Sequence, residues 1–251
     1  PDTKDKMNLR IKAGVDHFHD VRTMSHKDVA MLARSFEIDI AVDLGGHTQD
    51  CRTEIFAMSA APIQISYIGY PGTMGANYYD YLVADQTIIP EKNQKYYSEK
   101  IAYLPNYQVN DSKQSLPDTF FTREDLGLPE KGFIFCCFNK TSKITPTAFD
   151  SWARILQNVD ESVLLVEHHS LKESAEKNLI NEMTNRGIDP GRLIFGERLP
   201  KPEYLARYRV ADLFLDTLPY NAGTSASDAL RMGLPVLTCI GNSFASRMAA
   251  S

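Results

Sequence analysis

Short apolar runs alternate with longer segments of helical periodicity along the second half of this chain. The apolar runs lie at residues 132–138, 163–166, 193–195, 213–215 and 236–239. The periodic segments lie between them at residues 146–159, 171–186, 202–210 and 224–232. Short buried strands separated by helices of this length predict parallel β-α-β units with right-handed crossovers.

The first half shows the same alternation with fewer units. The pattern predicts strands at residues 38–43, 63–68, 81–83 and 101–104 and helices at residues 4–15, 25–36, 52–58 and 90–98. Ser25 followed by Asp28 is typical of a helix start. We therefore predict two doubly wound α/β domains facing a cleft, residues 1–120 and 121–251, with the polar segment 105–120 as the linker.

Five loops rich in turn residues each follow a predicted strand. They lie at residues 43–48, 69–75, 139–143, 197–201 and 216–225. Ligands of open parallel sheets bind outside the carboxyl ends of the strands. The sequence therefore predicts that these loops line one cleft.

Residues 213–230 read as a strand, a turn and a helix that opens on Gly223-Thr-Ser. Backbone N–H groups and the positive end of the helix dipole favour a phosphate there, and Thr224 and Ser225 can add hydroxyl hydrogen bonds. Asp228, one turn inside the helix, can accept hydrogen bonds from ribose hydroxyls. The alternative is an ordinary connection whose helix is capped by Thr224 or Ser225.

Two further loops carry candidate chemistry. Lys140 and Lys143 follow the first strand of the second half, just before a helix that Thr145 is expected to cap. Lys143 is a candidate partner for a diphosphate, and the alternative is a solvated loop lysine. His47, after two glycines, could act as a base, bind a sugar hydroxyl or be a hydrogen-bonded structural residue.

Composition narrows the classes of function. The chain has 251 residues, 43% of them hydrophobic, and a net charge of −5, so we expect neither a nucleic acid nor a membrane as partner. The four cysteines lack paired-ligand spacing, and Cys136 and Cys137 are expected to face a core. We expect a cytoplasmic protein without a metal site or cofactor. No Gly-x-Gly-x-x-Gly follows the first strand of either half, which disfavours a nicotinamide enzyme.

Several stretches in order resemble the catalytic region of one family. They are Asp43-Leu-Gly-Gly-His-Thr, Arg52-x-Glu-Ile-Phe-Ala, Ala61-Pro-Ile-Gln, Ile68-Gly-Tyr-Pro-Gly-Thr-x-Gly, Tyr97-Ser-Glu-Lys-Ile-Ala-Tyr-Leu-Pro, Phe138-Asn-x-x-x-Lys, Leu215-Asp-Thr and Ala245-Ser-Arg. Together they resemble the O-linked N-acetylglucosamine transferases and SPINDLY proteins. The resemblance implies a GT-B fold and metal-independent, inverting sugar transfer to serine or threonine of proteins. It also implies an N-terminal array of tetratricopeptide repeats in the parent protein.

The resemblance implies a role for each matching residue. Lys143 matches the lysine that contacts the donor diphosphate and is the expected catalytic residue. Thr224 and Ser225 match the pair at the phosphate-binding helix, and Asp228 matches the carboxylate that holds the ribose. The remaining matches are Ile68 and Gly69 at the donor sugar and Leu199 to Lys201 at the base.

Three positions depart from the animal enzymes of the family. Gly223 and Tyr204 stand where those enzymes carry histidine, near the sugar and the base, and Lys140 stands for a glutamine near the phosphates. UDP-N-acetylglucosamine is the expected donor. GDP-fucose is an alternative, and so is a nucleotide-sugar or protein-binding fragment without turnover.

The two ends of the chain lead to a further expectation. The chain begins without a leading strand, stops inside a helical pattern and lacks the family's Asp–His motif. We therefore expect both domains to be incomplete and the chain alone to be inactive. Self-association through uncovered sheet faces is an accompanying expectation.

Overall fold

The structure is a computed structural model that describes residues 6–70, 72–108, 111, 116–167 and 173–251. The chain divides into two compact units, Pro1–Leu82 with Tyr97–Lys100 and Val83–Tyr96 with Ile101–Ser251. This division passes through two strands, whereas the sequence predicts a boundary near residue 120, which stays a prediction. The segment expected as a linker, 105–120, lies partly outside the described residues.

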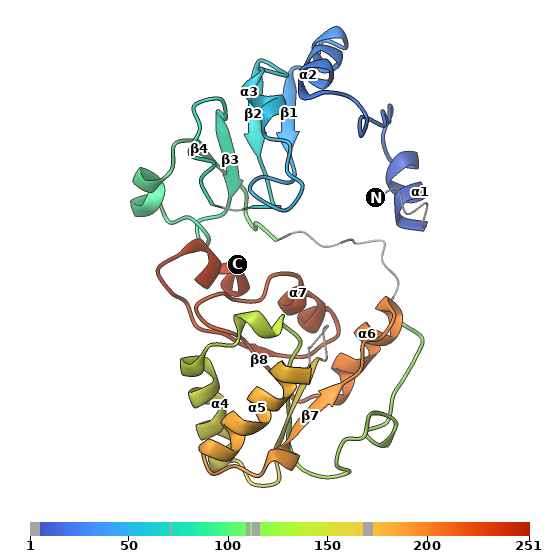
Figure 1. Cartoon of the computed structure of the whole chain (residues 1–251), viewed down its shortest axis with the longest axis vertical. Coiled ribbons are helices and arrows are strands. Elements are labelled where there is room, and N and C mark those ends of the chain that lie inside the picture. The colour runs from blue at the N-terminus through green and yellow to red at the C-terminus, as the bar shows by residue number, and fades with distance from the viewer. Residues whose placement is uncertain (1–5, 71, 109–110, 112–115, 168–172) are drawn as a thin grey trace. The chain divides into compact units, whose positions relative to one another are not determined.

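The first sheet has the order β1-β2-β3-β4 (Figure 1). β1 pairs with β2, and β2 with β3, in parallel. Its strands are β1 (Ile40–Asp43), β2 (Ile63–Ser66), β3 (Tyr81–Ala84) and β4 (Lys100–Tyr103), and its helices are α1 (Lys6–Ala13), α2 (His26–Ser35) and α3 (Glu54–Ala57). All four predicted strands are thus confirmed, each within about two residues of its predicted ends.

Local chemistry explains both a confirmed and a wrong prediction in this part of the chain. The Ser25 hydroxyl accepts a hydrogen bond from the backbone N–H of Asp28 at 3.1 Å, which confirms the start of α2. Residues 90–98 were predicted as an α-helix but form the 3₁₀-helix Glu91–Tyr96. That segment buries no residue, so no apolar stripe stabilises a longer α-helix.

The second sheet is parallel throughout, in the order β7-β6-β5-β8-β9. Its strands are β5 (Ile134–Cys137), β6 (Val163–Glu167), β7 (Leu193–Gly196), β8 (Leu213–Leu215) and β9 (Val236–Leu237). Every residue of β5 and β6 is buried, as expected for central parallel strands covered on both faces. The chain reverses direction across the sheet between β5 and β8, which makes that gap the topological switch point.

Four α-helices connect these strands. They are α4 (Pro146–Asn158), α5 (Glu173–Asn185), α6 (Lys201–Arg207) and α7 (Thr224–Arg231). Thr145 caps α4 through the backbone N–H of Ala148, and Pro146 begins the helix, as predicted. The helix predicted at 202–210 is instead α6 followed by the 3₁₀-helix Tyr208–Val210, and the predicted start of α5 at 171 lies outside the described residues.

The two adjacent cysteines lie in the core of the second unit. Cys136 and Cys137 are both buried within β5, among the side chains of the neighbouring strands and helices. Burial raises the pKa of the Cys137 thiol to about 12, so the thiol stays protonated. The expected core position is confirmed. Among the described residues, no helix is long and apolar enough to cross a membrane.

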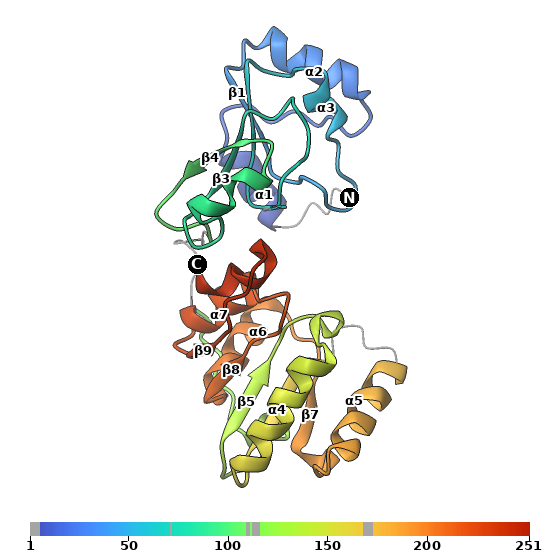
Figure 2. The ribbon, with the colours of Figure 1, turned by 90° about the vertical axis from the view of Figure 1, so that its left-hand side faces the viewer.

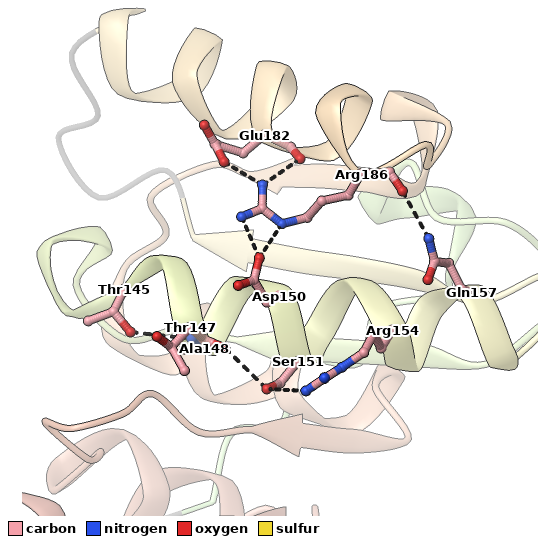
Figure 3. Close-up of polar contacts among 9 residues, drawn as sticks. All are labelled: Thr145, Thr147, Ala148, Asp150, Ser151, Arg154, Gln157, Glu182 and Arg186. Carbon is pink, nitrogen blue, oxygen red and sulfur yellow. Dashed lines mark hydrogen bonds and ion pairs between the residues drawn. The ribbon is translucent and has the colours of Figure 1, made fainter.

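Arg186, just beyond α5, ties α5 to α4, which lies beside it (Figure 2). Its Nε donates to Asp150 of α4 at 2.6 Å, and its guanidinium also pairs with Glu182 (Figure 3). In return, Gln157 of α4 donates to the backbone carbonyl of Arg186 at 2.9 Å. The guanidinium lies 5.4 Å from the ring centroid of Phe149. These contacts raise the pKa of Arg186, mainly through the hydrogen bond to Glu182.

Arg186→Ala should lower the free energy of unfolding by about 1–2 kcal/mol, because it removes the charge-assisted hydrogen bond to Asp150 of α4 and the one to Glu182 of α5. Both carboxylates are about half exposed. Arg154→Ala is the matched control. Arg154 is exposed on α4, and among the described residues its side chain bonds only Ser151 of the same helix, so its loss should cost less than about 0.5 kcal/mol. Urea unfolding measures the free energy of unfolding of both variants. Equal losses would contradict a stabilising contact between α4 and α5 through Arg186.

Candidate active site

A buried carboxylate lies at the switch point of the second sheet. Asp216, directly after β8, accepts hydrogen bonds at Oδ1 from Asn139 Nδ2 at 3.0 Å and from the backbone N–H of Ala222 at 2.7 Å. Its Oδ2 accepts from the Thr238 hydroxyl at 2.6 Å. Asn139 follows β5 and Thr238 follows β9, so one side chain ties together the carboxyl ends of three strands.

The Lys143 side chain lies against the loop that Asp216 holds. Its Nζ donates to the backbone carbonyl of Asn221 at 3.0 Å and lies 4.1 Å from the ring centroid of Tyr220. Burial lowers the pKa of Lys143, and the Asp216 carboxylate offsets part of that effect. Lys143 is thus a half-buried, anchored cation, and the alternative of a solvated loop lysine does not describe its surroundings.

A cavity of about 620 Å³ opens beside the N-terminus of α7. Its lining comes from the end of β6, the loop after β7, α6 and α7. It consists of Glu167, Arg198, Leu199, Pro200, Lys201, Tyr204, Thr224, Ser225 and Asp228. Its size is within the usual range of small-molecule sites. The cavity therefore joins the residues predicted to hold the base, the ribose and part of the diphosphate.

The N-terminus of α7 corrects one alternative of the sequence analysis. Gly223 is the N-cap residue and no side chain caps the helix, so neither Thr224 nor Ser225 has the capping role. Both residues lie inside the first turn, where backbone N–H groups have no partner within the helix. Within the described residues, no acceptor bonds the N–H of Thr224 or Ser225. These two donors are therefore available to an anion.

An ion pair lies across the cavity. Lys201, the first residue of α6, donates from Nζ to Asp228 Oδ2 at 2.6 Å. Asp228 is buried, whereas Lys201 is about half exposed. The Lys201 ammonium also lies 4.9 Å from the ring centroid of Tyr204. Because the lysine stem is flexible and reaches solvent, the pair can open without unfolding the site.

Tyr204 lines the cavity and is held there through its hydroxyl group. Its hydroxyl lies 2.6 Å from that of Tyr208, which in turn donates to the carbonyl of Ser225 at 3.2 Å. Burial raises the pKa of both tyrosines, so both stay neutral. Tyr204 is thus tied to α7 through its hydroxyl.

A second, fully buried ion pair lies behind the cavity. Glu167 Oε1 and Arg207 Nη2 are 3.3 Å apart, and both side chains are only 1% exposed. Arg207 also donates to the carbonyl of Glu197 at 2.8 Å and lies 4.2 Å from the ring centroid of Phe138. Arg207 therefore holds the loop after β7, which carries Leu199.

Three predicted sugar-side residues lie in the first unit. Ile68 has a positive φ of 61°, and a Cβ on Gly69 would come within 2.1 Å of the Leu44 carbonyl, so only glycine fits there. His47 Nε2 lies 3.0 Å from the Met74 carbonyl, and its ring packs edge-on against Tyr70 at 5.3 Å. The loops after β1 and β2 therefore lie against each other. These contacts favour the structural role for His47.

The remaining predicted residues lie outside the 620 Å³ cavity. Lys143 is anchored at Asn221, Lys140 is exposed, and Gly223 lines a different hollow of about 360 Å³ on the other side of α7. Arg198 and Pro200 line the cavity from the loop 197–201 that was predicted to line a cleft, whereas Glu167 was not predicted as a lining residue. Glu167 could have been predicted as a paired or ligand-binding residue, because it follows the apolar run 163–166 and a buried strand seldom ends in a charge without a partner.

Comparisons with known proteins identify the family of this chain. The sequence profile of glycosyl transferase family 41 matches residues 1–121 and 115–251. The probable UDP-N-acetylglucosamine–peptide N-acetylglucosaminyltransferase SEC of Arabidopsis thaliana is 39% identical over 248 residues, covering 96% of this chain and 25% of that protein. The corresponding protein SPINDLY of Solanum lycopersicum is 29% identical over 237 residues, covering 93% of this chain and 25% of that protein.

A solved structure is similar along both units. A mutant of the O-GlcNAc transferase from Thermobaculum terrenum superposes with a TM-score of 0.88 and 31% identity, over 98% of this chain and 46% of that one. The fold is thus that of a GT-B glycosyltransferase. The chain belongs to glycosyl transferase family 41. It spans about a quarter of the length of the curated relatives it matches.

The buried pair predicts a particular pattern of stability. Arg207→Leu should lower the free energy of unfolding by about 3–5 kcal/mol, because it removes the buried cation 3.3 Å from the buried Glu167 carboxylate. The double variant Arg207→Leu with Glu167→Met should recover much of that loss, since an apolar pair can replace a buried ion pair. Denaturant unfolding of both variants checks this, and additive losses would contradict it.

Proposed function

We propose that this chain provides the donor site of a protein O-glycosyltransferase, which transfers N-acetylglucosamine from UDP-N-acetylglucosamine to serine or threonine hydroxyls. The observation that carries the proposal is the cavity that joins Leu199, Lys201, Asp228 and the uncapped N-terminus of α7. A carboxylate, a cation and two free backbone donors in one hollow suit a nucleoside diphosphate. The names of the relatives specify a UDP-N-acetylglucosamine donor for those proteins.

Each part of the nucleotide has a matching group. The ribose hydroxyls would donate to Asp228, which requires Lys201 to swing from its present bond toward the nucleotide. The N–H groups of Thr224 and Ser225 would bind phosphate oxygens at the helix N-terminus. The base would lie at the Leu199 end, against the backbone between Leu199 and Lys201 and the Tyr204 side chain.

Lys143 is the proposed catalytic residue. Inversion requires in-line attack by the acceptor hydroxyl while negative charge grows on the departing diphosphate. An anchored ammonium and the end of α7 would stabilise that charge without reorganisation, in place of a divalent metal. We therefore propose a metal-independent reaction. The expected role of Ile68 and Gly69 at the donor sugar stays a prediction. A cytoplasmic location and the protein acceptor stay predictions.

Nucleotide titration tests the proposed donor. UDP should bind the chain more tightly than GDP, and excess EDTA should leave the affinity unchanged. Asp228→Asn should weaken UDP binding about tenfold, because a charged acceptor of ribose hydroxyls contributes roughly 1.5 kcal/mol. Asp160→Asn, at the opposite end of β6, is the matched control. Calorimetry measures these affinities. Preference for GDP would favour the alternative GDP-sugar donor, and no nucleotide binding at all would contradict the proposal.

Turnover tests the role of Lys143 in the full-length protein. Lys143→Ala should lower kcat by roughly 10²–10³, by analogy with the loss of one oxyanion donor, while donor affinity falls less. Lys131→Ala is the control, because Lys131 is exposed and lies just before β5 at the amino end of the sheet. Transfer of labelled sugar to a peptide is the measurement. Wild-type turnover in Lys143→Ala would remove Lys143 from the catalytic site.

A further inference from the structure

Tyr220 has no part in the function proposed above, yet its ring contacts the proposed catalytic lysine. The Lys143 Nζ lies 4.1 Å from the ring centroid. The Tyr220 side chain is 44% exposed, so burial of the ring does not account for its position. An ammonium within about 6 Å of an aromatic face is attracted by the quadrupole of the ring.

The backbone on both sides of Tyr220 is held firmly. The Tyr220 carbonyl accepts a hydrogen bond from the Thr217 hydroxyl at 2.6 Å, and Asn221 Nδ2 donates to the Thr217 carbonyl at 2.9 Å. Ala222 N–H bonds Asp216, as described above. The ring therefore projects from a fixed loop, and the flexible lysine stem is the partner that must be held.

We infer that Tyr220 is a positioning residue, whose ring face and the neighbouring Asn221 carbonyl hold the Lys143 ammonium in place before the donor binds. This inference rests on the proposed role of Lys143. An ammonium has three N–H donors, and Asn221 accepts one of them. The ring attracts the charge without accepting a directed hydrogen bond from it, so Lys143 keeps donors for phosphate oxygens while its stem is restrained.

The groups around Lys143 determine how strongly its charged form is favoured. Burial disfavours its charged form, the Asp216 carboxylate favours it, and Lys140 opposes it. The ring of Tyr220 covers the cation in place of water. The attraction of its π face should therefore offset part of the hydration free energy that the ammonium loses when it leaves water.

Two variants distinguish attraction by the aromatic face from simple exclusion of water by an apolar side chain. Tyr220→Phe keeps the ring and removes the hydroxyl, whereas Tyr220→Leu keeps an apolar side chain without a π face. The pKa of Lys143 is measured in residues 1–251 by NMR of ¹³C-labelled lysine Cε groups, with Lys143→Met assigning the signal. Tyr220→Leu should lower that pKa by about half a unit, and Tyr220→Phe should keep the wild-type value.

Kinetics of the full-length protein supply a second readout. Tyr220→Leu should lower kcat about two- to fivefold with little change in the donor KM, and Tyr220→Phe should restore wild-type kcat. A Lys143 pKa in Tyr220→Leu equal to or above that of wild type would overturn the inference. So would a phenylalanine variant that behaves like the leucine variant. Absence of UDP binding in the wild type would instead defeat the proposed function, and the NMR titration would still decide the lysine contact.

Discussion

The site of this protein depends on a buried carboxylate at the place where its second sheet reverses direction. Asp216 is only 6% exposed, and a charge removed from water to that extent is stabilised only by hydrogen bonds and neighbouring cations. Asn139, the N–H of Ala222 and Thr238 supply the hydrogen bonds, and Lys143 lies near enough to interact electrostatically. The same contacts fix the loop between β8 and α7.

Fixing that loop has two consequences for the chemistry. It sets where α7 begins, and therefore where the uncapped N–H groups of Thr224 and Ser225 lie. It also places the Asn221 carbonyl against the Lys143 ammonium, so the cation is anchored before any ligand arrives. Preorganised donors and charges need no rearrangement as charge develops, which is the property that sugar transfer from a diphosphate requires.

Much of this organisation could be predicted from the sequence, because parallel sheets have a strong local signature. The apolar runs predict the strands, and Thr145 and Pro146 predict the start of α4. Lys201, Thr224 and Asp228, which the sequence assigns to one ligand, line the same cavity, and their roles in binding stay predictions. Spacing could not reveal that Gly223, a residue without a capping side chain, occupies the N-cap position of α7. It also could not reveal that Glu167 pairs with Arg207, 40 residues further along the chain. The Glu167–Arg207 pair joins the end of β6 to α6, and no local pattern encodes a contact between elements that far apart in the sequence.

A crystal structure of residues 1–251 with UDP tests the central claim most directly. We predict that the ribose hydroxyls lie within hydrogen-bond distance of Asp228, that Lys201 has left its present bond, and that a phosphate oxygen contacts the N–H of Thr224 or Ser225. A UDP molecule bound elsewhere, with the Lys201–Asp228 pair intact and the N-terminus of α7 unoccupied, would contradict the account.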